Sequence, residues 1–298
     1  MSSTLYQRIH VVINPASGKD EPILNVLNDV FSQHGLEWDI SLTKKYGDAT
    51  EFARKAAESG DYDLVAGYGG DGTQHEIANG VMDTGVAMGV LPGGTGNGFC
   101  TELGIPDQLR PAVELLCGGS RLRKIDIARV DGDGREPMLF VQRLYTGIEP
   151  ESQTSREEKD HYGTFAYVRS GIQRLRQLQN VPYTLTIDGQ KISEEGVKCY
   201  VVNSAMAGTG ISIDPTFAID DGLLDVFIVG KNFEQLASAG DRLLHLRTRQ
   251  AGLHVWHGKE ITIDAAVDQP VWTDGEYYGR TPVSISVLPG AFNVVVPA

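Results

Sequence analysis

Short apolar runs alternate with longer amphipathic stretches in the first third of the chain. The run 9–13 is rich in β-forming residues, and apolar residues then recur at helical spacing across 23–31. A second predicted strand, 38–43, precedes a helix that we expect to begin at Asp48, with Glu51 three residues later as in a capping box. This alternation predicts a parallel sheet with flanking helices, which binds ligands at the carboxyl ends of its strands.

Two further apolar runs, 63–66 and 86–91, each end in a glycine-rich turn, at 67–73 and 92–97. Glycines allow main-chain N–H groups to approach an anion closely, and a helix that begins there adds the positive end of its dipole. The segment 14–18, NPASG, offers similar amides after the first strand. The pattern therefore predicts a phosphate site built from loops, although a plain strand-to-helix turn would look similar at any one of them.

Two other nucleotide-binding motifs fit these loops less well. The chain lacks the G-x-x-x-x-G-K-[ST] pattern of a P-loop. Gly67, Gly69 and Gly72 do satisfy G-x-G-x-x-G, but a dinucleotide site requires an acidic residue roughly 20 positions later, where this chain has Leu-Pro-Gly at 91–93. Phosphate transfer is therefore favoured over a dehydrogenase.

The pattern changes after a predicted helix at 108–117. Short β-rich runs follow one another, separated by turn signals such as Asp188-Gly189, which predicts an antiparallel β-sandwich. The predicted strands are 124–130, 138–145, 183–188, 198–206, 223–229, 254–257, 259–265, 270–274, 283–288 and 292–297. We expect an α/β nucleotide-binding domain over 1–125, a mainly β acceptor domain over 126–290, and a final strand, 291–298, that returns to the first domain.

Two predicted helices, 165–179 and 234–249, interrupt the β pattern and carry a local excess of arginine on an acidic protein. A solvated helix face explains such a pattern most simply, and contact with an anionic membrane surface is the alternative. The polar segment 151–162 is predicted to be a mobile loop.

Composition narrows the class of protein. With 298 residues, 41% hydrophobic, and a net charge of −13, the chain is typical of globular proteins and unlike one that coats nucleic acid. Cys100, Cys117 and Cys199 form no C-x-x-C pair, so neither a disulfide framework nor a zinc site is indicated. No apolar stretch reaches the roughly 18 residues of a transmembrane segment, and we expect a cytoplasmic protein that meets membranes peripherally.

The two glycine loops together, GGDGT at 69–73 and LPGGTGN at 91–97, resemble those of the diacylglycerol kinase catalytic family, which includes bacterial lipid kinases and sphingosine and ceramide kinases. Further matches are NPASG, IDDGLLDV at 219–226, DGE at 274–276 and the tail 281–297. The resemblance implies an ATP-dependent, Mg²⁺-requiring kinase that transfers the γ-phosphate to a lipid hydroxyl at a membrane surface.

The resemblance also assigns roles to residues. Asp71 would lie near the phosphates and hold Mg²⁺, Glu276 would be the general base, and Asp221, with main-chain groups near Ala218 and Leu223, would form a second, structural Mg²⁺ site. The positions assigned to ATP are Asn14, Pro15, Ala16, Ser17, Gly18, Thr43, Gly69, Gly70, Asp71, Gly72, Thr73, Glu76, Gly94, Thr95, Gly96 and Asn97.

Departures from the family pattern leave alternatives open. The chain has Gly98 where the family usually has Asp, His75 where it favours Asn, and no Asn within 141–145. A catalytically weak nucleotide- or lipid-binding member is therefore one alternative, and an NAD kinase, which shares GGDGT, is another. His254 and His257 are too oddly spaced on a strand to share a metal. The acceptor lipid and the oligomeric state, including a homodimer through a strand edge of the second domain, stay open.

Overall fold

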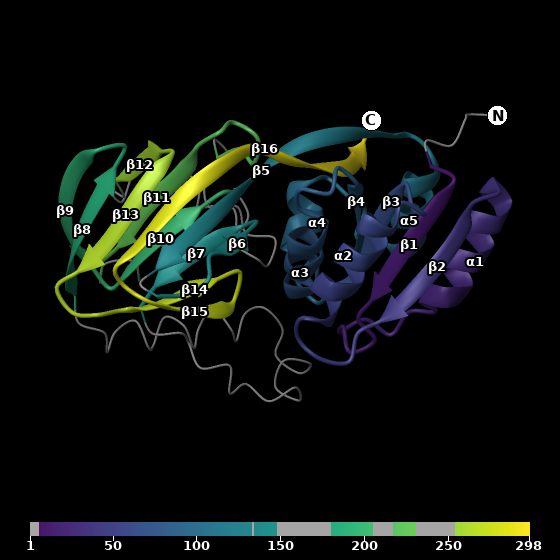
Figure 1. Cartoon of the computed structure of the whole chain (residues 1–298), viewed down its shortest axis with the longest axis horizontal. Coiled ribbons are helices and arrows are strands. Elements are labelled where there is room, and N and C mark those ends of the chain that lie inside the picture. The colour runs from purple at the N-terminus through teal and green to yellow at the C-terminus, as the bar shows by residue number, and fades with distance from the viewer. Residues whose placement is uncertain (1–5, 133, 148–179, 205–216, 231–253) are drawn as a thin grey trace, which may run out of the picture. The chain divides into compact units, whose positions relative to one another are not determined.

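The computed structural model falls into two compact units (Figure 1). The first holds the chain up to Ile127 together with Pro289–Ala298, and the second holds most of the chain between. The residues that the structure describes are 6–132, 134–147, 180–204, 217–230 and 254–298. The predicted helices at 165–179 and 234–249 and the predicted loop at 151–162 lie outside these residues.

The first unit is organised on a parallel sheet in the order β2-β1-β3-β4. These strands are β1 Arg8–Ile13, β2 Glu37–Leu42, β3 Leu64–Gly69 and β4 Ala87–Pro92. Every residue of β3 and β4 is buried, as expected of central strands covered on both faces. The end of the last strand, β16, adds beside β4 in parallel, with Val294 opposite Met88.

Five helices among the described residues accompany this sheet: α1 Ile23–His34, α2 Asp48–Ser59, α3 Asp71–Val81, α4 Gly98–Glu102 and α5 Leu109–Cys117. α1 packs beside α5, and α2 packs beside α3. Gly80 allows the second pair to approach closely, since a Cβ atom there would lie 2.7 Å from the Thr50 carbonyl oxygen. The alternating β/α architecture predicted from the sequence is thus confirmed.

The predicted capping box of α2 is wrong. The N-cap is Gly47, in the left-handed region at φ 88°, and no side chain caps the helix from within. The Asp48 carboxylate instead accepts the N–H groups of Lys44 and Lys45, at 2.8 and 3.0 Å, which lowers the pKa of this carboxyl. Asp48 and Glu51 have the spacing of a capping box, but the N-cap position is taken by Gly47, so Asp48 is already the first residue of the helix.

The second unit is a mainly β sandwich, as predicted. One sheet holds β9-β8-β13-β16, with β5 and β6 attached, and the other has the order β12-β11-β10-β7-β14-β15. Its strands are β5 Ser120–Gly132, β6 Met138–Phe140, β7 Arg143–Thr146, β8 Val181–Ile187, β9 Gln190–Gly196, β10 Lys198–Val202, β11 Leu224–Val229, β12 Val255–Gly258, β13 Glu260–Ala265, β14 Pro270–Thr273, β15 Glu276–Arg280 and β16 Val283–Pro297. Residues such as Leu185, Val201 and Ile263, from both sheets, form the core between them.

Several details of the second unit differ from the predicted strands. The run 138–145 forms two strands, β6 and β7, rather than one. The runs 283–288 and 292–297 form a single strand, β16, which passes through Gly290 at φ 58°. The strands β9 and β15 were not predicted. The turn at Asp188-Gly189 is confirmed as a two-residue hairpin, with positive φ at both residues.

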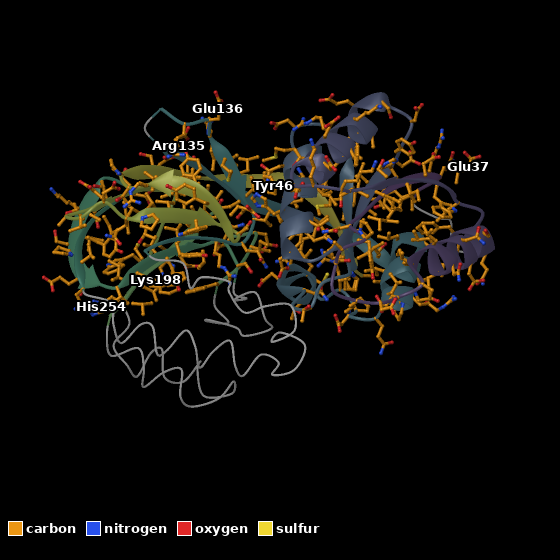
Figure 2. All side chains as sticks on the ribbon, turned by 90° about the horizontal axis from the view of Figure 1, so that it is seen from below. Glu37, Tyr46, Arg135, Glu136, Lys198 and His254 are labelled. Atoms are coloured by element: carbon orange, nitrogen blue, oxygen red, sulfur yellow. The ribbon has the colours of Figure 1, made fainter. Side chains whose placement is uncertain are left out.

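The two histidines of the β12 region take separate partners. His254 is labelled in Figure 2. His257 pairs through Nδ1 with the buried carboxylate of Asp225, its neighbour across the β11–β12 ladder. His254 Nδ1 lies 3.9 Å from Glu194, and its ring meets Trp256 edge-on. None of the helices in the described ranges is long and apolar enough to cross a membrane.

A buried histidine lies in the first half of β1. His10 is 7% exposed; its Nε2 lies 3.0 Å from Ser41 Oγ, and its ring packs edge-on against Tyr62. Its Nδ1 is buried and has no hydrogen-bond partner among the described residues. Burial lowers the pKa of His10, although the nearby Asp39 carboxylate opposes this effect.

We expect the first unit to lose stability in mild acid through His10. Because its pKa is lower in the folded protein, the unfolded chain binds a proton first, and the free energy of unfolding falls as the pH drops below about 6.5. Replacing His10 with Gln should flatten the dependence of the melting temperature on pH between roughly 7.5 and 5.5. His34→Gln, at the exposed end of α1, is the control and should behave as wild type. Equal slopes in wild type and His10→Gln would contradict the assignment.

Candidate functional site

Three loops meet at one edge of the parallel sheet. They follow β1, β3 and β4, which are neighbours in the sheet, so their carboxyl ends lie side by side. The loops comprise residues 14–19, the Gly70 turn into α3, and residues 93–97 before α4. Each of the three glycine-containing segments identified in the sequence is therefore brought to the same place.

Main-chain hydrogen bonds join the three loops directly. Asn14 N–H donates to the Tyr68 carbonyl at 2.9 Å, Lys19 N–H donates to the Gly93 carbonyl at 3.2 Å, and Gly93 N–H donates to the Gly69 carbonyl at 3.0 Å. The first and third loops are thus tied to each other and to the end of β3.

The Asn14 side chain shapes the first loop and connects it to α3. Its Oδ1 accepts the Ala16 N–H at 3.0 Å, while its Nδ2 donates to Thr73 Oγ1 at 3.0 Å. Ser17 Oγ donates to the Asn14 carbonyl at 2.7 Å. This asparagine therefore holds its own loop closed and fixes it against the GGDGT turn.

Two glycines of this region are required by close approach. A Cβ atom at Gly94 would lie 2.5 Å from Gly70 Cα, and one at Gly18 would lie 2.7 Å from Thr95 Oγ1. At Gly94 any side chain would push the Gly70 main chain away, whereas at Gly18 the Thr95 hydroxyl would have to turn aside. The Gly70 and Gly94 backbones therefore pack closely, with no space for a side chain at Gly94.

Part of this arrangement faces solvent. The exposed positions are Pro15, Ala16, Gly18, Gly72 and Thr95. Asn14, Ser17, Gly70, Asp71 and Gly96 are half-buried. Bare main chain at a sheet edge, next to the start of α3, is the chemistry that binds a phosphate group.

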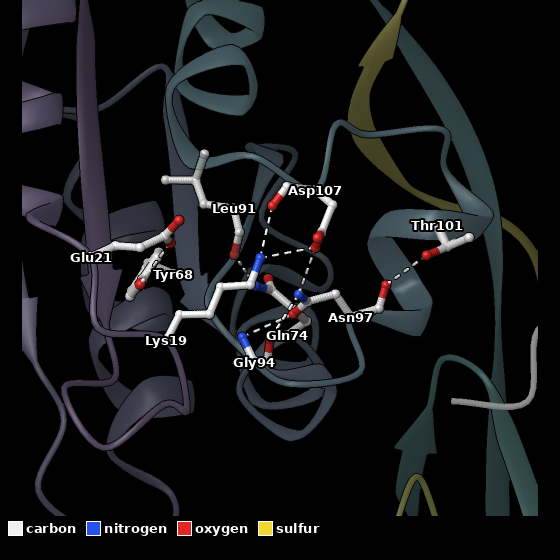
Figure 3. A network of polar contacts seen from close by, with 9 residues as sticks. All are labelled: Lys19, Glu21, Tyr68, Gln74, Leu91, Gly94, Asn97, Thr101 and Asp107. Atoms are coloured by element: carbon white, nitrogen blue, oxygen red, sulfur yellow. Dashed lines mark hydrogen bonds and ion pairs between the residues drawn. The ribbon is translucent and has the colours of Figure 1, made fainter. Parts of the chain in front are cut away.

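Asn97 organises the third loop from inside (Figure 3). In the left-handed conformation at φ 47°, its Oδ1 accepts the Gly94 N–H at 2.9 Å and its Nδ2 donates to the Gly94 carbonyl at 2.8 Å. Nδ2 also donates to Asp107 Oδ1 at 3.1 Å, and Lys19 Nζ lies 2.9 Å from the same oxygen. The hydrogen bond from Lys19, and then that from Asn97, lowers the pKa of Asp107.

Asp71 connects the GGDGT turn to the helix after the third loop. Its Oδ2 accepts the Gly98 N–H at 3.1 Å and its Oδ1 accepts the Phe99 N–H at 2.9 Å, so it satisfies the free amides at the start of α4. Gly98, the position of the Asp missing from the family pattern, contributes its main-chain N–H to this contact.

Glu76 of α3 lies near the start of α2, and Thr43 directly follows β2. Glu76 Oε2 accepts the N–H groups of Gly47 and Ala49, at 2.8 and 3.2 Å, and so caps α2 from the neighbouring helix. Burial raises the pKa of Glu76, and these hydrogen bonds oppose the rise. Thr43 N–H donates to the Ile13 carbonyl at 2.9 Å, which brings the end of β2 to the same sheet edge as β1.

In the second unit, Asp274 fixes the turn that precedes Glu276. Its carboxylate accepts the N–H groups of Val141, Gln142 and Arg143 at 2.7, 3.1 and 2.8 Å. These contacts explain why β6 and β7 are separate strands. Glu276 begins β15 and is half-buried, and in the described part of the chain its carboxylate has no hydrogen bond or ion pair.

Ala218, Asp221 and Leu223 lie in one turn before β11, which bends at Gly222 with φ 73°. The exposed Asp221 carboxylate accepts the Leu223 N–H at 2.9 Å. Among the described residues, no group of three or more His, Cys, Asp or Glu side chains could hold a metal ion. A cation at either predicted position would therefore need main-chain, phosphate or water oxygens as well.

Comparisons with known proteins agree with this architecture over the whole chain. Residues 8–130 match the diacylglycerol kinase catalytic domain, and residues 142–296 match the YegS C-terminal NAD kinase beta sandwich-like domain. A diacylglycerol kinase of Staphylococcus carnosus is 30% identical over 98% of this chain and 95% of its own length. The chain belongs to the diacylglycerol kinase family.

Other members of this family are similarly close. A diacylglycerol kinase of Staphylococcus aureus is 29% identical over 98% of this chain and 93% of its own. A crystal structure of a diacylglycerol kinase from Bacillus anthracis covers 99% of this chain and 98% of its own, with 26% identity and a TM-score of 0.80. Kinases of this family use ATP, which suits a cradle of main-chain amides.

We call the loop residues 14–18, 69–73 and 94–97 the phosphate cradle. Lys19, Gln74 and Asp107 were not predicted to belong to it, but the structure places them directly beside it. Lys19 directly follows NPASG, and its ion pair with Asp107 spans 88 positions in the chain. No local sequence pattern predicts a partner this far away in the chain. Gln74 follows GGDGT directly and is 2% exposed, so a polar residue at an otherwise apolar helix position was the available signal.

We expect Gly94→Ala to open the cradle. The new methyl group would have to displace the Gly70 backbone. If these loop amides bind phosphate as predicted, a displacement of about 1 Å should weaken ATP binding at least roughly tenfold. Calorimetric titration with an ATP analogue measures the change. The control is Gly230→Ala, since a Cβ atom there meets nothing within 4 Å. Unchanged affinity in Gly94→Ala would show that the two loops can separate without cost.

Asp274→Ala should destabilise the second unit. Three N–H groups would lose a charged acceptor, so we expect the free energy of unfolding to fall by about 2–3 kcal/mol in urea titration. Asp268→Ala is the matched control, because Asp268 makes an exposed ion pair with Arg280 and should cost less than about 1 kcal/mol. If the free energy of unfolding fell equally in both variants, the hydrogen bonds of Asp274 would contribute no more to stability than an exposed ion pair.

Proposed function

We propose that this protein is an ATP-dependent lipid kinase that transfers the γ-phosphate to a lipid hydroxyl of the diacylglycerol type. The observation that carries the proposal is the close packing of three amide-bearing loops at one sheet edge, with Gly94 against Gly70 and Gly18 against Thr95. Phosphoryl transfer requires mainly that the phosphates be positioned and their charge stabilised, and main-chain N–H groups that point to the ligand contribute to both.

The residues divide into binding and chemical roles. The loop positions 14–18, 69–73 and 94–97 would hold the phosphates of ATP. Asp71 supplies a hard oxygen ligand, and bound Mg²⁺ would there neutralise phosphate charge. Because Asp71 also accepts the Gly98 and Phe99 N–H groups, its position is fixed before any ligand binds.

Glu276 is proposed as the general base that takes the proton of the lipid hydroxyl as its oxygen attacks phosphorus. Two observations support this role. Asp274 fixes the preceding turn by accepting three main-chain N–H groups, and the Glu276 carboxylate has no hydrogen bond or ion pair among the described residues. A base must be oriented and available, and a carboxylate without a partner among the described residues supports the second condition. Asp221, with main-chain oxygens of Ala218 and Leu223, is proposed as the structural cation site.

Activity should be tested with ATP, Mg²⁺ and a panel of acceptors in mixed micelles. The panel contains diacylglycerol, phosphatidylglycerol, a sphingoid base and ceramide, with NAD as the acceptor for the alternative NAD kinase. We expect a phospholipid product by mass spectrometry. Phosphorylation of NAD alone would replace the proposal, and ATP binding without any product would favour a catalytically silent member.

Glu276→Gln tests the proposed base. It removes the proton acceptor but keeps the size of the side chain, so kcat should fall by roughly 10²-fold or more while ATP affinity stays unchanged. Glu195→Gln, on the exposed strand β9 of the same unit, controls for loss of surface charge. A wild-type kcat in Glu276→Gln would remove Glu276 from the mechanism.

A further inference from the structure

Gln74 connects the ends of the two strands that deliver the glycine loops. It lies in the first turn of α3 and is 2% exposed. Its Nε2 donates to the Gly67 carbonyl of β3 at 2.9 Å and to the Leu91 carbonyl of β4 at 3.2 Å (Figure 3). One side-chain amide thus spans both strands just before Gly69-Gly70 and Gly93-Gly94.

The same side chain carries a cost. Its Oε1 is buried and has no hydrogen-bond partner among the described residues. A buried polar atom without a partner destabilises a fold, and nearly all such atoms in proteins are paired. An apolar side chain would avoid this cost but would also take the N–H donors away from the Gly67 and Leu91 carbonyls. The glutamine is therefore suited to joining the two strands.

Gly67 makes room for this amide. A Cβ atom at Gly67 would lie 2.8 Å from Gln74 Oε1 and 2.2 Å from Ile77 Cδ1. Gly67 lies inside β3 rather than in a turn, and its lack of a side chain leaves space for both Ile77 and Gln74 of α3. Strand and helix are matched to place the amide against both carbonyls.

The loops beyond these strands have no slack. Gly93 N–H donates to the Gly69 carbonyl, and Gly94 lies so near Gly70 that even a Cβ atom would not fit between them. A small shift of the end of β4 relative to β3 would therefore either break this hydrogen bond or force the loops together. Whatever fixes the two strand ends also fixes the spacing of the loop amides.

We propose that Gln74 is a positioning residue of the phosphate cradle, which sets the separation of the β3 and β4 ends and hence of the amides that bind ATP. The inference rests on the proposed function, in which these loops hold the ATP phosphates. Gln74 does not touch the ligand; it acts through Gly67 and Leu91. The buried Oε1, which has no hydrogen-bond partner among the described residues, lowers stability locally as a consequence of this placement.

The test compares Gln74→Met with Val81→Ala. Methionine keeps the length of the side chain and removes both N–H donors, whereas Val81→Ala leaves a cavity at the buried end of the same helix. Calorimetric titration with a non-hydrolysable ATP analogue, without lipid, gives Kd, and thermal melts give the change in stability. We expect Kd to rise about tenfold in Gln74→Met and to stay within about twofold in Val81→Ala, because misplacement of binding groups costs affinity and a remote cavity does not.

The outcomes separate this proposal from the function on which it rests. Equal changes of Kd in the two variants, or an unchanged Kd in Gln74→Met, would overturn the positioning role. Wild-type protein that binds the ATP analogue but phosphorylates no lipid would contradict the proposed acceptor only, and the comparison of Kd values would still stand. Wild-type protein that binds no ATP analogue would overturn both.

A second measurement guards against a variant that folds poorly. Amide hydrogen exchange of the ligand-free proteins, read for residues 67–73 and 91–97, should speed up in Gln74→Met and in Gln74→Asn, whose shorter amide cannot span both carbonyls. In Val81→Ala, exchange in these segments should match wild type. Protection that is unchanged in both Gln74 variants would show that the strand ends are held without this side chain.

Discussion

The close approach of glycine backbones at the edge of the parallel sheet is the constraint on which the first unit depends. The Gly94 main chain packs against Gly70, and Gly93 N–H donates to the Gly69 carbonyl. Loops this close can carry amides on one surface only if nothing larger than hydrogen stands between them. The buried side chains of Gln74 and Asn97 hold the strands and the third loop from within.

Carboxylates in this protein satisfy free amides at the points where chain segments must be fixed. Asp71 does so for α4, Glu76 for α2 and Asp274 for the segment between β6 and β7. A charged acceptor holds an N–H group more strongly than a neutral one does. For Asp71, a role in folding and a role in ligand binding are compatible, because the Gly98 and Phe99 N–H groups hold its carboxylate in one orientation.

The sequence predicted the fold class well because its signals were local. Alternating apolar runs and helical spacing identify β1 to β4 and α1, and a type of turn as specific as Asp188-Gly189 identifies its hairpin. The misses have physical reasons. Asp48 looked like a cap, yet Gly47 redirected the chain, and Glu76, from another helix, supplied the cap instead. Of the candidate site, the glycine loops were readable, whereas Lys19 and Asp107 meet only in three dimensions.

The path of β16 has a consequence for synthesis of the protein. This strand begins in the second unit, and its last part adds to β4 of the first. On the ribosome, the parallel sheet can therefore form from β1 to β4 early, but its β4 edge stays uncovered until residues 289–297 emerge. An open strand edge invites pairing with other chains. The first unit therefore completes its parallel sheet only after the second unit has been synthesised, and a chain cut between the two units would lack the strand that pairs with β4.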